Sequence, residues 1–90
     1  MRVTVRYQTQ IRRALGVAAE TVEMSESCAL ADLTRHLGAR HGETFRRLVL
    51  TEAGEPHESV LVFVGDRQVC GAVALRDGDV VTLLAPMAGG

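Results

Sequence analysis

The stretch RDGDVVTLLAPMAGG (residues 76–90) decides how this chain folds, because a turn, a strand and a run of small residues follow one another in it. Arg76-Asp77-Gly78-Asp79 is a strong turn signal, and the apolar run Val80 to Leu84 has the length of a strand. The final Ala85-Pro86-Met87-Ala88-Gly89-Gly90 has no side chain larger than methionine, so it can lie extended in a narrow channel with the Gly90 carboxylate leading. A terminal Gly-Gly alone also suits a frayed end, so the upstream sequence must decide between these interpretations.

The composition predicts one soluble domain without a nucleic-acid or membrane partner. Hydrophobic residues make up 47% of the 90 residues, and the formal net charge of -1 lacks the basic surplus that nucleic-acid binding usually requires. No apolar run approaches the ~20 residues of a membrane span, and no apolar signal core precedes the first strand. We therefore expect a cytoplasmic protein. All ten basic residues are arginines, so lysine chemistry is absent from the sequence.

The first part of the chain indicates two strands joined by a long loop. From Arg2 to Tyr7, polar and apolar residues alternate, which predicts a half-buried strand with Val3, Val5 and Tyr7 on its buried face. Gln8 to Leu15 is polar and irregular and is expected to be a loop that ends at Gly16. Val17 to Met24 again carries β-branched residues and predicts the second strand of a hairpin.

One helix stands out in the middle of the chain. Leu30, Leu33 and Leu37 recur at helical spacing, Ser25 and Ser27 precede them as helix-start residues, and Gly42 is placed as a C-cap. The pattern predicts a helix from about Leu30 to His41. Phe45, Leu48 and Val49 suggest a short second turn of helix, and Thr51 to Glu58 is expected to be a surface loop.

The remaining elements complete a sheet. Val60 to Val64 is an uninterrupted apolar run, which predicts a central strand buried on both faces, and Arg67 to Val69 is expected to pair with it. Val80 to Leu84 is the last strand. The order of elements predicts an α+β domain over residues 1–84, with a mixed sheet of four to five strands and one main helix packed on one face.

The side chains offer no catalytic or metal-binding pattern. His36 and His41 are five residues apart and therefore on different helix faces, and His57 lies alone in its loop, so surface histidines are expected rather than a metal site. Cys28 and Cys70 form no CxxC and are expected to be reduced, semi-buried thiols. Cys28 at the helix start is either a thiol activated by the helix dipole or, as we favour, a small apolar residue. No nucleophile, base and oxyanion hole assemble, so no intrinsic catalysis is expected.

The whole chain resembles the ubiquitin-like sulfur carriers of the MoaD/ThiS family. The resemblance rests on the hairpin, the leucine-spaced helix, the apolar strand, the Asp77-Gly78-Asp79-Val80-Val81 segment and the final Pro86-Met87-Ala88-Gly89-Gly90. The short spacing between this turn and the glycines is far more specific than Gly-Gly alone. The sequence departs at Gly65, where many members have asparagine, and that change affects a turn. The resemblance implies a β-grasp fold over residues 1–84 and a flexible C-terminal tail at 85–90.

The resemblance also implies a chemistry for that tail. In the family, an adenylating enzyme related to ubiquitin-activating enzymes uses ATP to convert the terminal glycine carboxylate to an acyl-adenylate, and a sulfur donor then makes the thiocarboxylate. Carried onto this chain, the reacting carbon is that of Gly90, while Gly89, Ala88, Met87 and Pro86 thread into the partner's active site. The protein would then be a co-substrate that binds no cofactor or metal, and ATP would be bound by the adenylyltransferase and sulfurtransferase partner.

Several roles remain open at this point. The second partner implied is a sulfur-acceptor enzyme, and the chain could be the small subunit of a molybdopterin-synthase-type complex. Such carriers serve the synthesis of molybdopterin, thiamine, cysteine and sulfur-containing natural products, and also tRNA thiolation. The length of the loop from Thr51 to Glu58 favours the cysteine-route and longer MoaD-like carriers. The alternatives are a ubiquitin-like modifier conjugated through Gly90 and a non-catalytic β-grasp interaction module.

Overall fold

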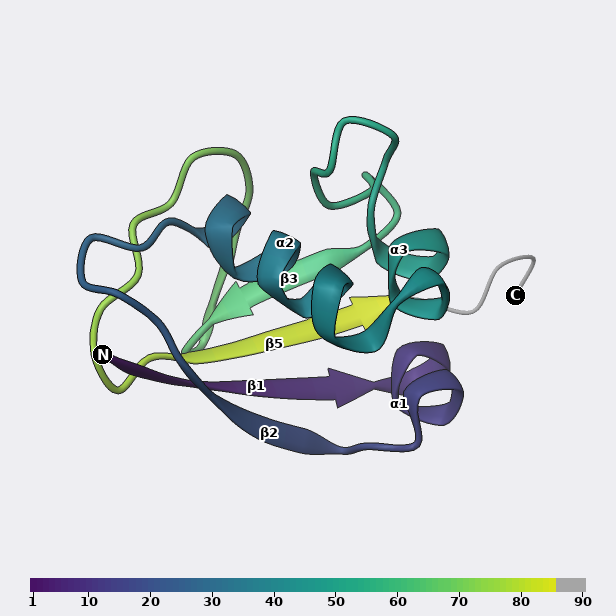
Figure 1. Ribbon diagram of the computed structural model, residues 1–90, viewed down its shortest axis with the longest axis horizontal. Coiled ribbons are helices and arrows are strands. Elements are labelled where there is room, and N and C mark those ends of the chain that lie inside the picture. Colours follow the sequence, from purple (N-terminus) through teal and green to yellow (C-terminus); the bar gives the residue numbers. More distant parts are fainter. Residues whose placement is uncertain (86–90) are drawn as a thin grey trace.

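A five-stranded mixed sheet carries its helices on one face (Figure 1). The computed structural model describes residues 1–85 of the chain. In chain order the elements are β1 (Arg2–Gln8), α1 (Thr9–Leu15), β2 (Ala19–Glu23), α2 (Leu30–His41), α3 (Glu43–Val49), β3 (Leu61–Val64), β4 (Arg67–Val69) and β5 (Val80–Ala85). The predicted α+β class and mixed sheet are confirmed.

The first and last strands lie side by side in the middle of the sheet. The strand order is β2-β1-β5-β3-β4, with β1 and β5 parallel and every other neighbouring pair antiparallel. In the parallel pair, Val5 lies opposite Val81 and Tyr7 lies opposite Leu83. Parallel neighbours need a long crossover connection, which here contains all the other elements of the chain.

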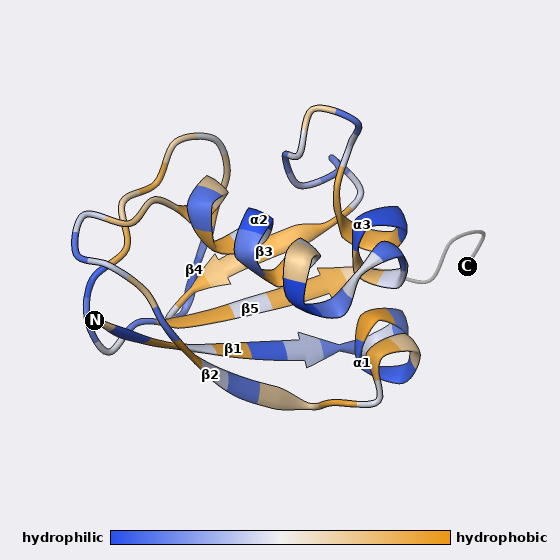
Figure 2. Cartoon of the chain, viewed as in Figure 1, coloured by the Kyte–Doolittle hydropathy of each residue, from blue (hydrophilic) through white to orange (hydrophobic). Residues whose placement is uncertain are grey.

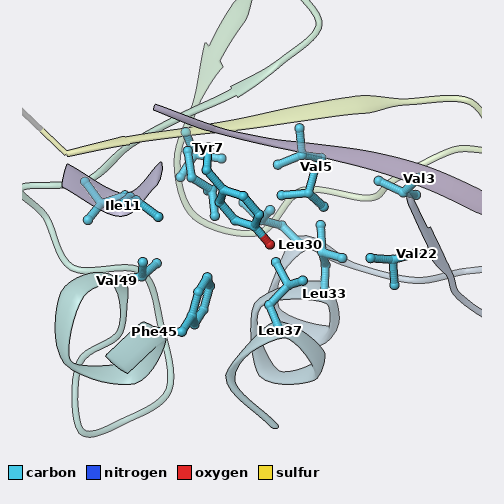
Figure 3. Close-up of a cluster of buried hydrophobic side chains, with 14 of the residues drawn as sticks. Val3, Val5, Tyr7, Ile11, Val22, Leu30, Leu33, Leu37, Phe45 and Val49 are labelled. Carbon is cyan, nitrogen blue, oxygen red and sulfur yellow. The ribbon is translucent and has the colours of Figure 1, made fainter. Parts of the chain in front are cut away.

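The core lies between the sheet and the helices. Val3, Val5 and Tyr7 of β1 point toward α2 and α3 (Figure 3), and all three are buried as predicted. Leu33 and Leu37 of α2 have no exposed surface, and Phe45 of α3 packs beside them. The leucine spacing therefore identified the buried face of α2 correctly.

The segment expected to be a loop between the first two strands contains helix α1. Ile11 is fully buried and Leu15, four residues later, is partly buried against the core. Gly16 ends the helix at φ 71°, and its N–H donates to the Arg12 carbonyl oxygen at 2.9 Å. A helix of seven residues is marginal in isolation, so burial of Ile11 on the rest of the domain, rather than local propensity, stabilises α1.

Helix α2 begins without either predicted serine cap. Its N-cap is Ala29, whose N–H donates to Asp32 Oδ2 at 2.9 Å, while Ser27 lies in the preceding turn at φ 67°. The hydrogen bonds from Ala29 and Arg35 hold the pKa of Asp32 below its usual value. At the other end, the predicted C-cap is confirmed, because the Gly42 N–H donates to the Gly38 carbonyl oxygen at 2.9 Å. The short helix α3 and the surface loop after it are also confirmed.

Strand β3 differs from its prediction in position and in burial. We expected a central strand buried on both faces, whereas β5 is central and β3 lies between β5 and β4. Val62 is buried, but Leu61 and Phe63 keep partly exposed side chains. In Figure 2, β3 is hydrophobic throughout its length although the helices cover one face alone. Alternate residues of its apolar run therefore lie on the open face of the sheet.

We predict that Leu33→Ala will lower the free energy of unfolding by about 2 to 5 kcal/mol, because the leucine is fully buried between α2 and the sheet. Urea unfolding is the measurement. His36→Ala on the exposed side of the same helix is the control and should change stability by roughly 0.5 kcal/mol or less. Equal effects of the two substitutions would contradict the packing of Leu33 between α2 and the sheet.

Candidate functional site

The site residues predicted from the sequence lie beyond the part of the chain that the structure describes. They are Pro86, Met87, Ala88, Gly89 and Gly90. The structure does describe the point from which they depart. Ala85, which we had assigned to the tail, is the last residue of β5 and is 9% exposed. Its burial follows the alternation of Val81 and Leu83 on the same face.

The end of β5 lies beside α1 and α3. Figure 1 shows the carboxyl end of β5 directed toward these two helices, and α1 packs against both β5 and α3. The parallel pairing of β5 with β1 continues one residue beyond the end of β1, as a bridge between Thr9 and Ala85. The end of β5 therefore lies next to the junction of β1 and α1.

A patch of three apolar side chains and one threonine covers the part of the open sheet face next to the end of β5. We call Leu61, Phe63, Thr82 and Leu84 the open-face patch. Leu61 lies opposite Leu84 and Phe63 lies opposite Thr82 across the β3–β5 pair. All four alternate with buried residues of their strands, and all four are partly exposed. Side chains so paired across strands form one continuous surface.

The surroundings of the patch are polar. On β1, Gln8 lies opposite Leu84 and Arg6 lies opposite Thr82, and on β4 Gln68 lies opposite Phe63. An apolar centre with a polar rim is the usual composition of a protein-binding surface. This patch was not predicted from the sequence, because the uninterrupted apolar run of β3 was interpreted as a central strand buried on both faces. The available signal was that one main helix of twelve residues cannot cover both faces.

A polar cluster lies on the helix-covered face, at the edge formed by β2. The Tyr7 hydroxyl donates to Glu20 Oε2 at 2.5 Å, and His41 Nε2 lies 2.5 Å from the same oxygen. Arg40 Nε lies 3.1 Å from Glu20 Oε1, and the His41 ring stacks on Phe45. The cluster joins β1 and β2 to the last turn of α2. The Glu20 and His41 side chains are 11% and 15% exposed, so the expectation of a surface histidine at position 41 was wrong.

The electrostatics of this cluster keep Glu20 ionised. Burial opposes its charge, but hydrogen bonds from Tyr7 and His41, together with the charges of His41 and Arg40, outweigh burial and lower the pKa of Glu20. Burial, the hydrogen bond to Glu20 and its negative charge raise the pKa of Tyr7. These contacts tie β1 and β2 to the end of α2, so we interpret the cluster as structural.

The two cysteines occupy different environments. Cys28 is buried, and its burial and the negative charge of Asp32 raise the pKa of its thiol. The alternative of a thiol activated by the helix dipole is therefore wrong for Cys28. Cys70 is exposed rather than semi-buried, and both thiols are free. A buried thiol with a raised pKa is a poor nucleophile, so Cys28 is not suited to sulfur transfer.

The other candidate groups remain apart from one another. His36 is exposed on α2, and His57 is exposed in its loop, where its Nδ1 lies 3.0 Å from the Ser59 hydroxyl. Among residues 1–85, no three histidine, cysteine, aspartate or glutamate side chains come together in a way that could hold a metal ion. Within the same residues, no helix has both the length and the apolar character needed to cross a membrane.

Comparison with protein families gives a match over almost the whole chain. The model of the ThiS family matches residues 5–90. A comparison with curated proteins found no significant match. The family match includes both the described domain and the glycines at positions 89 and 90.

Solved structures with the same fold are also found. SAMP1 from Haloferax volcanii has a TM-score of 0.85 at 17% identity, with 100% of each chain covered. The putative molybdopterin converting factor subunit 1 from Pyrococcus furiosus has a TM-score of 0.79 at 32% identity, covering 97% of this chain and 99% of its own. A chain of the Amycolatopsis orientalis BexX/CysO complex has a TM-score of 0.69 at 30% identity, covering 98% and 99%. The predicted ubiquitin-like β-grasp fold is confirmed.

We predict that Glu20→Gln will lower the free energy of unfolding at neutral pH by roughly 1.5 to 3 kcal/mol, the usual value of hydrogen bonds to a charged group. Because folding lowers the pKa of Glu20, its contribution is present above the unfolded value of about 4.3 and is lost as pH falls through the folded value. The difference between wild type and Glu20→Gln should therefore shrink in acid, as measured by urea unfolding across pH.

Glu23→Gln provides the matched control on the same strand. Glu23 pairs with Arg2 at the surface, where both side chains are 69% exposed, so the substitution should have little effect at any pH. A stability difference for Glu20→Gln that stays constant from neutral to acidic pH would show that the carboxylate charge does not stabilise the cluster.

Proposed function

This chain belongs to the ThiS family, and on that premise we propose that it is a sulfur carrier whose Gly90 carboxylate is activated by a partner enzyme. The observation that carries the proposal is the family match over residues 5–90, which spans the β-grasp domain and the terminal glycines together. In this proposal the protein is a co-substrate, and the chemistry takes place at its terminal carbon in the active site of the partner.

The proposed reaction has two steps. The Gly90 carboxylate attacks the α-phosphorus of ATP, which forms an acyl-adenylate and releases pyrophosphate. Sulfide (HS⁻) released by a sulfur donor then attacks the acyl carbon, AMP leaves, and loss of the S–H proton gives the terminal thiocarboxylate. A carboxylate is a poor electrophile, so adenylation is needed to supply a leaving group. ATP and the sulfur donor are bound by partner enzymes in this scheme.

The folded domain supports this role through recognition rather than chemistry. Cys28 at the start of α2 is buried and the pKa of its thiol is raised, which makes it a poor nucleophile. The open-face patch, in contrast, is apolar and accessible, and it includes Leu84, the residue immediately before Ala85 at the exit of the chain. We propose that the activating enzyme docks on this patch, because a partner bound there lies next to Ala85, the residue that precedes the C-terminal segment in the sequence.

Chain length limits where the partner can place its active site. Five residues follow Ala85 in the sequence, and a fully extended chain of that length spans at most roughly 17 Å. The ATP-binding site of the activating enzyme must therefore lie within about that distance of the end of β5 when the domain is docked. None of these five residues has a side chain larger than that of methionine, and alanine and glycine in particular suit passage through a confined channel.

The acceptor of the sulfur is a separate question. The similarity to a putative molybdopterin converting factor subunit supports a role as the small subunit of a molybdopterin-synthase-type complex. The similarity to a chain of the BexX/CysO complex supports a carrier that delivers sulfur to another biosynthetic enzyme. Conjugation to proteins through Gly90 would pass through the same adenylate. Intact mass of the protein from its native cell separates sulfur transfer from conjugation, because an oxygen-to-sulfur replacement and a high-mass conjugate give different masses.

We predict that deleting Gly90, or adding a residue after it, will abolish ATP–pyrophosphate exchange by the cognate activating enzyme while leaving the melting temperature nearly unchanged. The reason is that the variant changes the reacting carboxylate without removing a residue of the described core. Full exchange by the variant that lacks Gly90 would mean that this carboxylate is not the reactive group, and the sulfur-carrier proposal would have to be abandoned.

We predict that Phe63→Ala will raise the KM for the carrier in the same assay by about tenfold or more and leave kcat unchanged. Central aromatic residues commonly dominate protein interfaces, and loss of uniform binding affects KM alone. Thr21→Ala is the control, because Thr21 is exposed on the same sheet face but on the distant edge strand β2. If both variants behave as wild type, the partner docks elsewhere on the domain.

A further inference from the structure

Thr9 has a backbone conformation that is unusual for its side chain. Its φ is 53°, in the left-handed region, and the one other non-glycine residue with positive φ among residues 1–85 is Ser27. A β-branched residue is disfavoured there, since its Cβ substituents crowd the backbone. Such conformations persist where the surrounding structure holds them, and they concentrate at functional sites.

The hydroxyl of Thr9 contacts the ends of two strands. Oγ1 lies 2.6 Å from the carbonyl oxygen of Ala85 at the end of β5, and 2.8 Å from that of Gln8 at the end of β1. Both partners are carbonyl oxygens and can only accept, so the hydroxyl is the donor and its single proton is shared between them. The shorter contact joins residues 76 positions apart in the sequence.

The contact to Ala85 affects the direction of the chain that follows. A peptide group is planar, so holding the Ala85 carbonyl also orients the bond to the nitrogen of residue 86. Residue 86 is proline, which has no N–H and cannot donate a further hydrogen bond to the neighbouring strand β1. The Thr9 hydroxyl therefore supplies a hydrogen bond at the point where the backbone ladder between β1 and β5 ends.

We propose that Thr9 is a positioning residue, whose hydroxyl orients the Ala85 carbonyl and thereby the direction in which the backbone continues from β5. This inference rests on the proposed function, because that direction matters for a reaction at Gly90. Thr9 itself does not touch the reacting atoms. It acts on the reaction by presenting the terminal carboxylate to the active site of a partner docked on the open-face patch, where small misplacements lower rates strongly.

Three substitutions separate the hydroxyl from the shape and the backbone conformation of Thr9. Thr9→Ser keeps the hydroxyl and removes the methyl group. Thr9→Val keeps the branched shape and removes the hydroxyl. Thr9→Gly removes the hydroxyl and relieves the backbone strain, since glycine adopts positive φ readily. If the residue had a purely structural role, the glycine variant would equal or exceed wild type.

The first measurement is ATP–pyrophosphate exchange by the cognate activating enzyme. We expect kcat to fall about five- to tenfold for Thr9→Val and Thr9→Gly, as expected when one orienting hydrogen bond is lost, with KM little changed because the docking surface is intact. Thr9→Ser should retain most of the wild-type kcat. Equal kcat in all three variants, or a loss that serine does not rescue, would overturn the inference.

The second measurement needs no partner enzyme. The carbonyl ¹³C chemical shift of Ala85 reports its hydrogen bonding, so it should move in Thr9→Val and Thr9→Gly and remain near the wild-type value in Thr9→Ser. An unchanged shift in the valine variant would show that the hydroxyl does not hold this carbonyl, and would overturn the inference.

The two proposals fail in distinguishable ways. If wild-type protein shows no exchange at all, the proposed activation of Gly90 fails, and the positioning role of Thr9 fails with it. If wild type exchanges normally and the Thr9 variants match it, the sulfur-carrier proposal stands and the role of Thr9 alone is rejected.

Discussion

The parallel pairing of β1 and β5 is the interaction on which the rest of this structure depends. It places the first and last strands of the described domain side by side at the centre of the sheet, where Val5 lies opposite Val81. All other elements lie in the crossover between them and pack against this pair or extend the sheet from it. The same pairing determines where the chain leaves the domain, because β5 cannot shift along β1 without moving its alternating side chains out of the core.

Because the helices cover one face of the sheet alone, the core that stabilises the domain and the proposed binding surface lie on opposite faces. The core that stabilises the fold lies under α2 and α3, with Tyr7, Leu33 and Phe45 in its centre. The opposite face retains Phe63 and Leu84 as partly exposed apolar groups, which add little to the core and are free to contact a partner. In the proposed function the two faces have different roles. The covered face holds the domain together, and the open face binds the activating enzyme.

Polar contacts hold this arrangement in place at two points, the edge of the sheet formed by β2 and the ends of the central strands β1 and β5. Glu20 joins β2 to the last turn of α2 through Tyr7, Arg40 and His41, so the hairpin edge and the helix end are coupled. The Thr9 hydroxyl joins the end of β1 to the end of β5. Hydrogen bonds to a partly buried carboxylate and to the end of a ladder are directional, so each specifies orientation where apolar packing alone would permit small shifts.

The sequence by itself determined most of the local elements and the candidate reacting end. Period-two alternation placed β1, the leucine spacing placed α2, and the resemblance of residues 76–90 to a known family pointed to Gly90. The position of β5 at the centre, the helix α1, the open-face patch and the Thr9–Ala85 contact were decided by the tertiary structure alone. The reason is physical. Periodicity reports neighbours within one element, whereas these features depend on contacts between residues distant in the chain, which no local pattern encodes.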